Sequence, residues 1–213
     1  NKVLQQRNAL LKRFQEMRIF EQETIDVWDV QLVEHGKVIY EKRQRFLDDF
    51  IPVFQKYFDL ISDHKEEIHI EYKSQLSEGD FLTQLHNSSR KDSMTGYTNV
   101  GIHKDDLIFM IHGQPIKKFG SQGQQKSFLI ALKLAQFDLI SKLLEMKPIL
   151  LLDDIFDKLD HDRVTHLMKL VSDHAFGQVF ISDTDMDRIE KVFREIDIEK
   201  KVFELIDNRI EEK

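Results

Sequence analysis

The sequence contains no cysteine, only three prolines and eight glycines among its 213 residues. The lack of cysteine excludes a disulfide framework, a thiol nucleophile and a zinc site built on thiolates. So few prolines and glycines exclude a collagen-like or linker-dominated chain. The longest apolar runs, such as 149–152, are far too short to cross a bilayer, and residues 1–13 lack the apolar segment of a secretory signal. We therefore expect a soluble, globular protein.

The composition and its distribution support this expectation. Hydrophobic residues make up 41% and charged residues 32% of the chain, which is typical of a folded domain, alone or with an appendage. The net charge of −7 is unevenly spread: six lysines and two acids lie in 116–147, whereas nine aspartates and three basic residues lie in 148–187. The first stretch suits anions and the second a cation or water chemistry. The chain does not begin with Met and opens as if within a helix, so we expect a fragment of a longer protein.

Residues 1–62 carry hydrophobic side chains on a seven-residue grid, which predicts helix. Gly36 and Pro52 interrupt this span, so we expect two helices that turn near Gly36. Packing against the protein's own body is the favoured interpretation, and a partner-binding coiled coil is the alternative. Alternation at 68–72 predicts a strand, and 79–94 an exposed helix that ends in the polar segment 87–93.

From about residue 100, strands and helices alternate. Strands are predicted at 107–111, 149–152, 179–182 and 202–206, and helices at 122–144, 162–174 and 186–195. This alternation predicts an α/β fold with a mainly parallel sheet and flanking helices. We expect a helical arm domain over 1–95, with a strand near 66–73, and an α/β lobe over 96–213.

A wholly apolar segment, 149–152, is followed at once by Asp153 and Asp154. Such a strand is expected to be buried on both faces, with its carboxyl end opening into a ligand crevice. Two adjacent carboxylates there suit Mg²⁺, which prefers oxygen ligands. In a phosphate-hydrolysing site the first would hold the ion and the second would orient or deprotonate water. The alternative is that the pair merely caps the next helix or turn.

The helix at 122–144 begins with a second candidate motif, Gly-Ser-Gln-Gly-Gln-Gln-Lys at 120–126. Ser121 and Gln124 have capping-box spacing, which is a sufficient structural explanation. Gly123, however, is unfavourable in a first helical turn unless something approaches the backbone closely. A helix start with free N–H groups, the Ser121 hydroxyl and nearby Lys126 is also suited to phosphate.

The order of these motifs resembles the signature, Walker B and D-loop of ABC-type ATPases. The segment 119–135 (FGSQGQQKSFLIALKLA) is similar to the signature helix of the RecF family, DNA replication and repair proteins related to SMC heads. Similarly, 149–160 (ILLLDDIFDKLD) resembles its Walker B and D-loop, and 101–107 (GIHKDDL) a further family segment. The fold implied is the C-terminal lobe of an ABC/SMC-type ATPase head with a helical arm.

The resemblance assigns roles to individual positions. It implies that Asp153 coordinates Mg²⁺, that Asp154 is the general base, and that the signature of one subunit contacts ATP held by another. The residues concerned are signature Ser121, Gln122, Gly123 and Gln124; D-loop Asp157, Lys158, Leu159 and Asp160; switch-position Thr184; and the weaker candidates His103 and Lys126. This chain departs from the family pattern at Ile102, Lys104 and Asp157. Lys104 replaces the family's usual Arg, which keeps the positive charge but loses the bidentate contacts that Arg makes.

The function implied is that of an ATP- and Mg²⁺-dependent DNA-binding protein, acting in the cytoplasm in replication, recombinational repair and the SOS response. ATP would drive homodimerisation, slow hydrolysis would release DNA, and recombinase would be loaded at gaps. The implied partners are single- and double-stranded DNA, RecR and RecO, with no membrane; candidate basic positions are Arg90, Lys91, Lys117 and Lys118.

One motif of an ATPase is missing. The sequence has no Gly-x-x-x-x-Gly-Lys-Ser/Thr loop, so we predict that this chain alone neither binds ATP tightly nor hydrolyses it. The alternative function is a scaffold with a degenerate ATPase, against which Ser121, Asp153 and Asp154 argue. A transporter ATPase subunit fits less well, because Gln122 stands where transporters usually have Gly.

Overall fold

The computed structural model describes residues 2–172, 176–194, 196, 200–206 and 209–212. These residues form two compact units: Asn1–Ile51 with Ile68–Pro115, and Pro52–Glu67 with Ile116–Lys213. The predicted domain boundary at residue 95 does not coincide with this division, which places 52–67 in the second unit and 96–115 in the first. The two predicted domains stay a prediction. Among the described helices, none has the length and apolar character that crossing a membrane requires.

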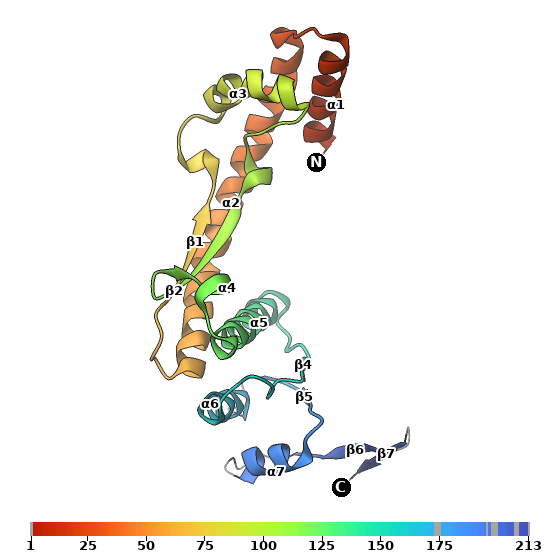
Figure 1. Cartoon of the computed structure of the whole chain (residues 1–213). Coiled ribbons are helices and arrows are strands. Elements are labelled where there is room, and N and C mark those ends of the chain that lie inside the picture. Colours follow the sequence, from red (N-terminus) through yellow and green to blue (C-terminus); the bar gives the residue numbers. More distant parts are fainter. Residues whose placement is uncertain (1, 173–175, 195, 197–199, 207–208, 213) are drawn as a thin grey trace. The chain divides into compact units, whose positions relative to one another are not determined.

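The first unit combines helices with a small antiparallel sheet (Figure 1). Its sheet has the order β1-β2-β3, with Ile68 opposite Ile111 and Lys73 opposite Asp106. The elements are α1 (Lys2–Met17), the part of α2 (Gln22–Ser62) up to residue 51, β1 (Ile68–Lys73), α3 (Phe81–Thr95), β2 (Asp106–Ile111), β3 (Gln114–Pro115) and 3₁₀ turns at Gln75–Ser77 and Ile102–Lys104. The alternation at 68–72 thus correctly predicted β1, and the apolar run at 107–111 predicted β2.

A buried ion network joins α1, α2 and α3. Arg7 is wholly buried, and its guanidinium donates to Asp29, to Asp92 at 2.7 Å and to the Thr98 hydroxyl at 2.9 Å. The backbone N–H of Asn99 donates to the other oxygen of Asp92 at 2.9 Å. Buried charges are stable only when paired and hydrogen-bonded, as they are here.

This network explains why the predicted exposure of the helix at 79–94 is wrong. The helix itself is confirmed as α3, Phe81–Thr95, but Ser88, Ser89 and Asp92 in its polar segment are buried. The helix is capped at Gly96, whose φ of 69° is the left-handed conformation that glycine adopts readily.

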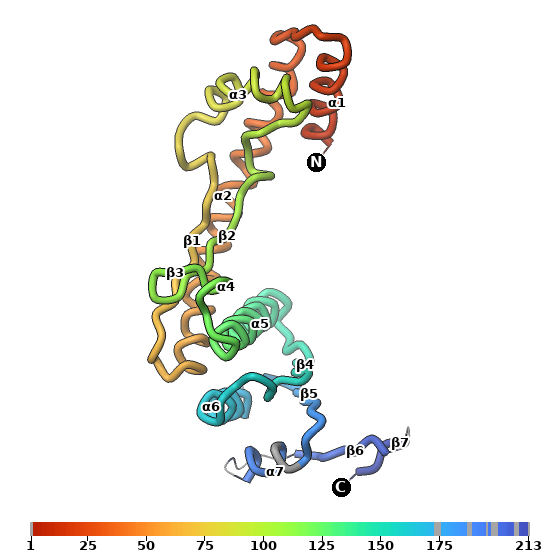
Figure 2. Tube along the Cα trace, viewed as in Figure 1, coloured from red at the N-terminus to blue at the C-terminus, as the bar shows by residue number. Residues whose placement is uncertain are grey.

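The predicted turn near Gly36 is also wrong. Helix α2 runs through both Gly36 and Pro52, and the chain reverses earlier, at 18–21, where Arg18 has a φ of 53° (Figure 2). A Cβ at position 36 would lie 2.8 Å from the Phe81 ring. Gly36 therefore permits close packing of α3 on α2 and does not mark a turn.

The second unit contains the remaining elements, all shown in Figure 1. They are the end of α2, α4 (Ile116–Phe119), α5 (Gln122–Leu144), β4 (Leu150–Asp153), α6 (His161–Ser172), β5 (Val179–Ser182), α7 (Met186–Arg194), β6 (Phe203–Ile206) and β7 (Arg209–Glu212). Strands β4 and β5 pair in parallel, with α6 between them in sequence, so the predicted α/β class is confirmed. The antiparallel hairpin β6–β7 includes a strand, β7, that the sequence did not predict. The predicted helix ends at His174 and Glu195 lie outside the described residues.

Several aromatic side chains pack together in the core of the second unit. Phe54 from α2 packs against Phe128 of α5, with ring centroids 5.0 Å apart, and Phe176 contacts both Tyr57 and Phe137. Burial and nearby Asp138 raise the pKa of Tyr57 to about 12. These contacts bury one face of α5 and thereby hold its N-terminus in a fixed place.

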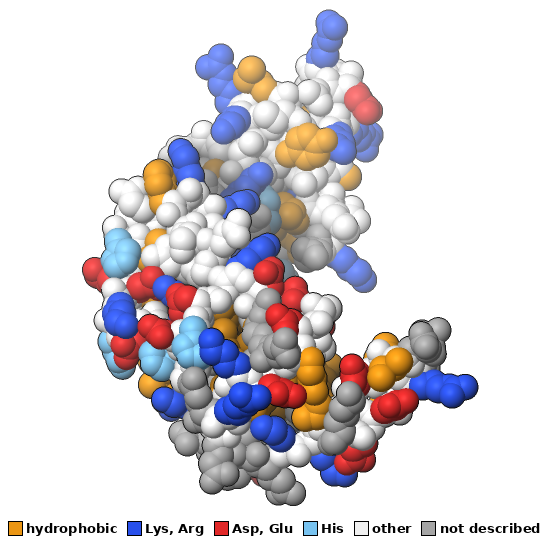
Figure 3. Space-filling view, turned by 60° about the horizontal axis from the view of Figure 1, so that its bottom comes forward, with side chains coloured by type: hydrophobic (Ala, Val, Ile, Leu, Met, Phe, Trp, Pro, Cys, Tyr) orange, Lys and Arg blue, Asp and Glu red, His pale blue; other side chains and the backbone are white. Residues whose placement is uncertain are grey.

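The expectation that β4 is buried on both faces is wrong for this chain. Leu150 and Leu152 are buried, but Leu151 is 70% exposed, and Phe180 on the neighbouring strand is 50% exposed. Figure 3 shows such uncovered hydrophobic side chains in orange among charged ones. A strand needs to be apolar on both sides only where both sides are covered.

Candidate functional site

The paired aspartates lie at the carboxyl end of β4. Asp153 is its last residue, stands opposite Ser182 of β5, and accepts a hydrogen bond from the Ser182 hydroxyl. Asp154 follows with a φ of 49°, and its N–H donates to the Ser182 carbonyl at 3.2 Å. Both carboxylate residues are exposed. The next helix, α6, begins only at His161, so the pair does not cap a helix, whereas a turn at 155–158 follows it directly.

Lys126 connects this strand end to α5. Its ammonium donates to the Asp154 carbonyl oxygen at 3.0 Å. The contact lies within one chain and uses the backbone of Asp154, which leaves that residue's carboxylate out of the bond. Lys126 therefore helps to fix the left-handed turn at Asp154.

The start of α5 has the capping box that the sequence predicted. Ser121 is the N-cap: its hydroxyl accepts from the Gln124 N–H at 3.2 Å, and the Gln124 side-chain oxygen accepts from the Ser121 N–H at 2.7 Å. Ser121 and Gln122 are exposed. The helix start is thus rigid and also open to solvent, so the structural and functional interpretations are compatible.

Gly123 has a partner within its own chain. A Cβ at this position would lie 3.3 Å from the Lys158 carbonyl oxygen, which is tighter than ordinary contact. Close approach was the predicted reason for this glycine, and in this structure the approaching backbone is that of the segment 157–160. Lys158 itself has a φ of 65°, so the segment turns sharply where it meets α5.

Within that segment, Asp160 directly precedes α6. Its carboxylate accepts from the Arg163 backbone N–H at 2.9 Å and from the Arg163 guanidinium at 3.0 Å. Burial raises the pKa of Asp160, but these hydrogen bonds outweigh burial and hold the pKa below its usual value. Asp157 and Lys158 form a longer ion pair at 3.8 Å.

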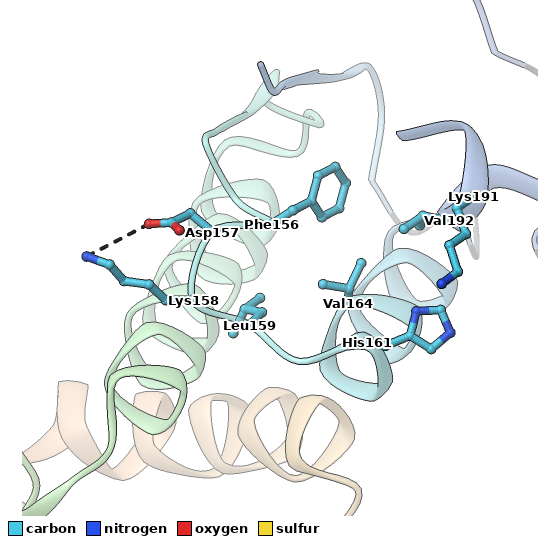
Figure 4. A pocket seen from close by; sticks show the side chains of 8 residues that line it. All are labelled: Phe156, Asp157, Lys158, Leu159, His161, Val164, Lys191 and Val192. Atoms are coloured by element: carbon cyan, nitrogen blue, oxygen red, sulfur yellow. Dashed lines mark ion pairs between the residues drawn. The ribbon is translucent and has the colours of Figure 1, made fainter. Parts of the chain in front are cut away.

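A pocket of about 320 Å³ adjoins the same segment (Figure 4). The side chains of Phe156, Leu159 and Val164 form its apolar part, and His161 and Lys191 stand at one side. Asp157 and Lys158 point away from the pocket, toward each other.

Three contributors were missed from the sequence: Ser182, Glu66 and Arg163. Glu66, from the segment after α2, accepts from the Gln124 side chain at 2.8 Å and from two nitrogens of Arg163 at 2.8 and 3.2 Å. The pKa of Arg163 is lowered by burial and raised by these bonds, with a net rise. The only available signal for Ser182 was its position at the end of the strand that pairs with β4; nothing near Glu66 in sequence pointed to it.

Two other predicted positions make contacts of their own. His103 belongs to the first unit, where its ring nitrogen hydrogen-bonds the Thr98 carbonyl at 3.0 Å, a structural contact. Thr184 is exposed in the loop after β5, within a turn in which the Asp185 N–H donates to Asp183 at 2.7 Å. The structure brings together the signature start, the D-loop segment and Lys126 with the Asp154 backbone.

Comparison with known proteins identifies relatives of this chain. The chain is 50% identical over 204 residues to the DNA replication and repair protein RecF of Flavobacterium johnsoniae and 46% identical over 214 residues to that of Phocaeicola vulgatus. These matches cover 96% and 100% of the chain. The chain belongs to the RecF family.

The RecF relatives are longer than this chain, which spans 57% of the length of both. Two solved structures of the recombination mediator RecF, one described with ATP and one with ATPrS, match all of the chain and 56% of their own length. Their TM-scores are 0.75 and 0.73, each at 25% identity. No protein-family model matches the chain.

Proposed function

We propose that this chain is the signature and Walker B portion of an ATP-gated DNA-binding protein of replication and recombinational repair. The observation that carries the proposal is the pairing, in one unit, of an exposed, capped helix start at Ser121 with exposed aspartates at a parallel strand's carboxyl end. The names of its relatives, and the ATP of one RecF structure, support the same function.

The donor set at β4 fits a magnesium ion. Asp153 offers a carboxylate and Ser182 a hydroxyl, which are the hard oxygen ligands that Mg²⁺ prefers. When bound, Mg²⁺ would offset the charge of the phosphates. In this proposal Asp153 holds the ion, while Asp154 accepts the proton of the attacking water.

The signature would act between copies of the protein. Ser121 would offer its hydroxyl and the free N–H groups of the α5 start to a γ-phosphate held by a second copy. The D-loop residues 157–160 would lie across that interface, with Thr184 near the same phosphate. ATP would thus stabilise a homodimer, and hydrolysis would release it.

The partners proposed from RecF resemblance are DNA, RecR and RecO, in the cytoplasmic response to DNA damage. Arg90 and Lys91 on α3, and Lys117 and Lys118 on α4, are exposed positions for phosphate contact. Contacts to phosphates release counterions, so binding through them weakens steeply as salt rises.

The test uses the full-length RecF protein that carries this chain. DNA affinity is measured with ATP, with ADP and without nucleotide, at several salt concentrations. We expect tighter binding with ATP, loss of ATP turnover in Asp154→Asn, and no change in Asp48→Asn, an exposed carboxylate on α2. Equal DNA affinity in all nucleotide states, or unchanged turnover in Asp154→Asn, would favour a scaffold with a degenerate ATPase.

A further inference from the structure

The side chains around Glu66 link the two motifs that the proposed function places at the nucleotide. Glu66 is only 9% exposed, and one of its oxygens accepts from both Gln124 and Arg163, each at 2.8 Å. Gln124 belongs to the signature start on α5. Glu66 itself comes from the segment between α2 and β1, far from either motif in sequence.

Arg163 extends the link to the D-loop. While its two terminal nitrogens contact Glu66, its Nε donates to Asp160 at 3.0 Å and Nη1 also donates to the Ser127 hydroxyl at 2.9 Å. One guanidinium thus reaches three partners on three segments. A lysine has a single charged nitrogen on a flexible stem and cannot reproduce this planar fork.

Glu66 also determines which way the Gln124 amide faces. A carboxylate accepts hydrogen bonds and donates none, so it selects the NH₂ end of the amide. The amide oxygen is then directed to the Ser121 N–H, at 2.7 Å, which completes the capping box. Both ends of Gln124 are therefore engaged within its own chain, and Glu66 reaches Ser121 through it.

Backbone contact makes the two motifs depend on one another. A Cβ added at Gly123 would lie 3.3 Å from the Lys158 carbonyl oxygen and 4.0 Å from Arg163 Nε. The D-loop backbone and the Arg163 guanidinium therefore both lie beside the start of α5. Glu66 contacts the same guanidinium.

We propose that Glu66 and Arg163 are positioning residues that hold the signature start and the D-loop in one fixed arrangement for ATP turnover. This inference rests on the proposed function and deepens it. Neither side chain touches the nucleotide in this proposal. Gln124 acts as the intermediate between Glu66 and Ser121 and has no phosphate contact of its own.

The decisive variant is Glu66→Gln in full-length RecF, with Glu67→Gln, an exposed neighbour, as the matched control. The glutamine keeps the size of the side chain but can face Gln124 in either orientation and loses the charge that holds Arg163. Misplacement by about 1 Å can lower a rate up to 100-fold, and we expect kcat to fall about tenfold. The KM for ATP should change less than about twofold and the control should match wild type, because Glu66 acts only through other side chains.

A double-mutant cycle separates positioning from general stability. If Glu66 acts partly through Gln124, the kcat loss of the double variant Glu66→Gln/Gln124→Ala should be smaller than the product of the two single losses, because the two changes share one path. Arg163→Lys, which keeps the charge but loses the fork, should lower kcat similarly at an unchanged unfolding midpoint. If Glu66→Gln does not fold, Gln124→Ala tests the same link between Glu66 and Ser121.

Three results would overturn the inference. A kcat for Glu66→Gln equal to that of the control, while Ser121→Ala and Asp154→Asn lose turnover, rejects the positioning pair and leaves the proposed function standing. If the kcat losses of Glu66→Gln and Gln124→Ala are additive in the cycle, Glu66 does not act through Gln124. The same holds if the loss of turnover in Glu66→Gln equals the fraction of protein that is unfolded. Full turnover in Ser121→Ala and Asp154→Asn rejects the proposed function, and this inference with it.

Discussion

Two ion networks built on arginines, one in each unit of the chain, differ in exposure. In the first unit Arg7 and its partners Asp29 and Asp92 are wholly buried. In the second unit Arg163 is 15% exposed, Glu66 9% and Asp160 63%. Removing one partner of a fully buried pair leaves a desolvated charge, whereas water can replace a partner near the surface. We therefore expect the buried network to contribute more to the stability of the fold than the partly exposed one.

The largest effect is expected from Arg7→Ala. It strands Asp29 and Asp92 without water or a counter-charge, so the free energy of unfolding of the first unit should fall by about 3–5 kcal/mol. Denaturant unfolding followed by circular dichroism measures this change. Arg45→Ala, at a side chain 79% exposed on α2, is the matched control and should change little. Equal losses for the two variants would contradict the role of the buried network.

Arg163→Ala should have a smaller effect on stability. Glu66 keeps its hydrogen bond from Gln124 and is partly exposed, so we expect a loss of about 1–3 kcal/mol, below that of Arg7→Ala. The same unfolding experiment compares the two variants. A loss as large as that of Arg7→Ala would mean that the second network is as essential to the fold as the first.

Gly123→Ala tests the contact between α5 and the D-loop. Alanine gains up to about 1 kcal/mol in helix propensity, but its Cβ presses on the Lys158 carbonyl. We expect stability to change by less than about 1 kcal/mol, because these terms oppose each other, while ATP turnover of full-length RecF falls. Lys133→Ala, at an exposed position further along α5, provides a comparison in the same helix. Unchanged turnover in Gly123→Ala would show that the D-loop tolerates displacement.

The smallest expected effect is on how the free energy of unfolding depends on pH. The pKa of Asp160 is below its ordinary value of 3.8 in the folded chain, so the folded state binds fewer protons there than the unfolded state. Its stabilising contribution is complete above that ordinary value and is lost as pH falls through the lower folded pKa. Asp160→Asn should therefore lose less stability than wild type between pH 6 and pH 3. Asp162→Asn, an exposed carboxylate two residues further on, should behave like wild type. A steeper acid loss in Asp160→Asn would contradict the assignment.

Local patterns predicted most elements of this fold, because each depends on nearby residues. The α5 capping box, the alternation in β1 and the apolar run of β4 all follow from spacing along the chain. The predicted turn at Gly36 and the predicted exposure of 87–93 were wrong because tertiary partners, Phe81 and Arg7, override local preference. Neither partner can be inferred from the segment it changes.

The candidate site shows the same limit. Ser121, Asp153 and Asp154 were found because their chemistry is concentrated in short motifs. Glu66 is 58 residues from Gln124 and 97 from Arg163, so no motif contains the pair. Only the fold brings these side chains together.

The most direct test of a site shared between two copies is complementation in full-length RecF. Asp154→Asn removes the proposed base, and Ser121→Arg obstructs the helix start that completes the other copy's site. Each variant alone should be inactive, but a mixed dimer has one intact site, so an equal mixture should regain about a quarter of wild-type ATP turnover. A mixture as inactive as either variant alone, with both variants folded and dimeric, would contradict a site in which Ser121 and Asp154 come from different copies.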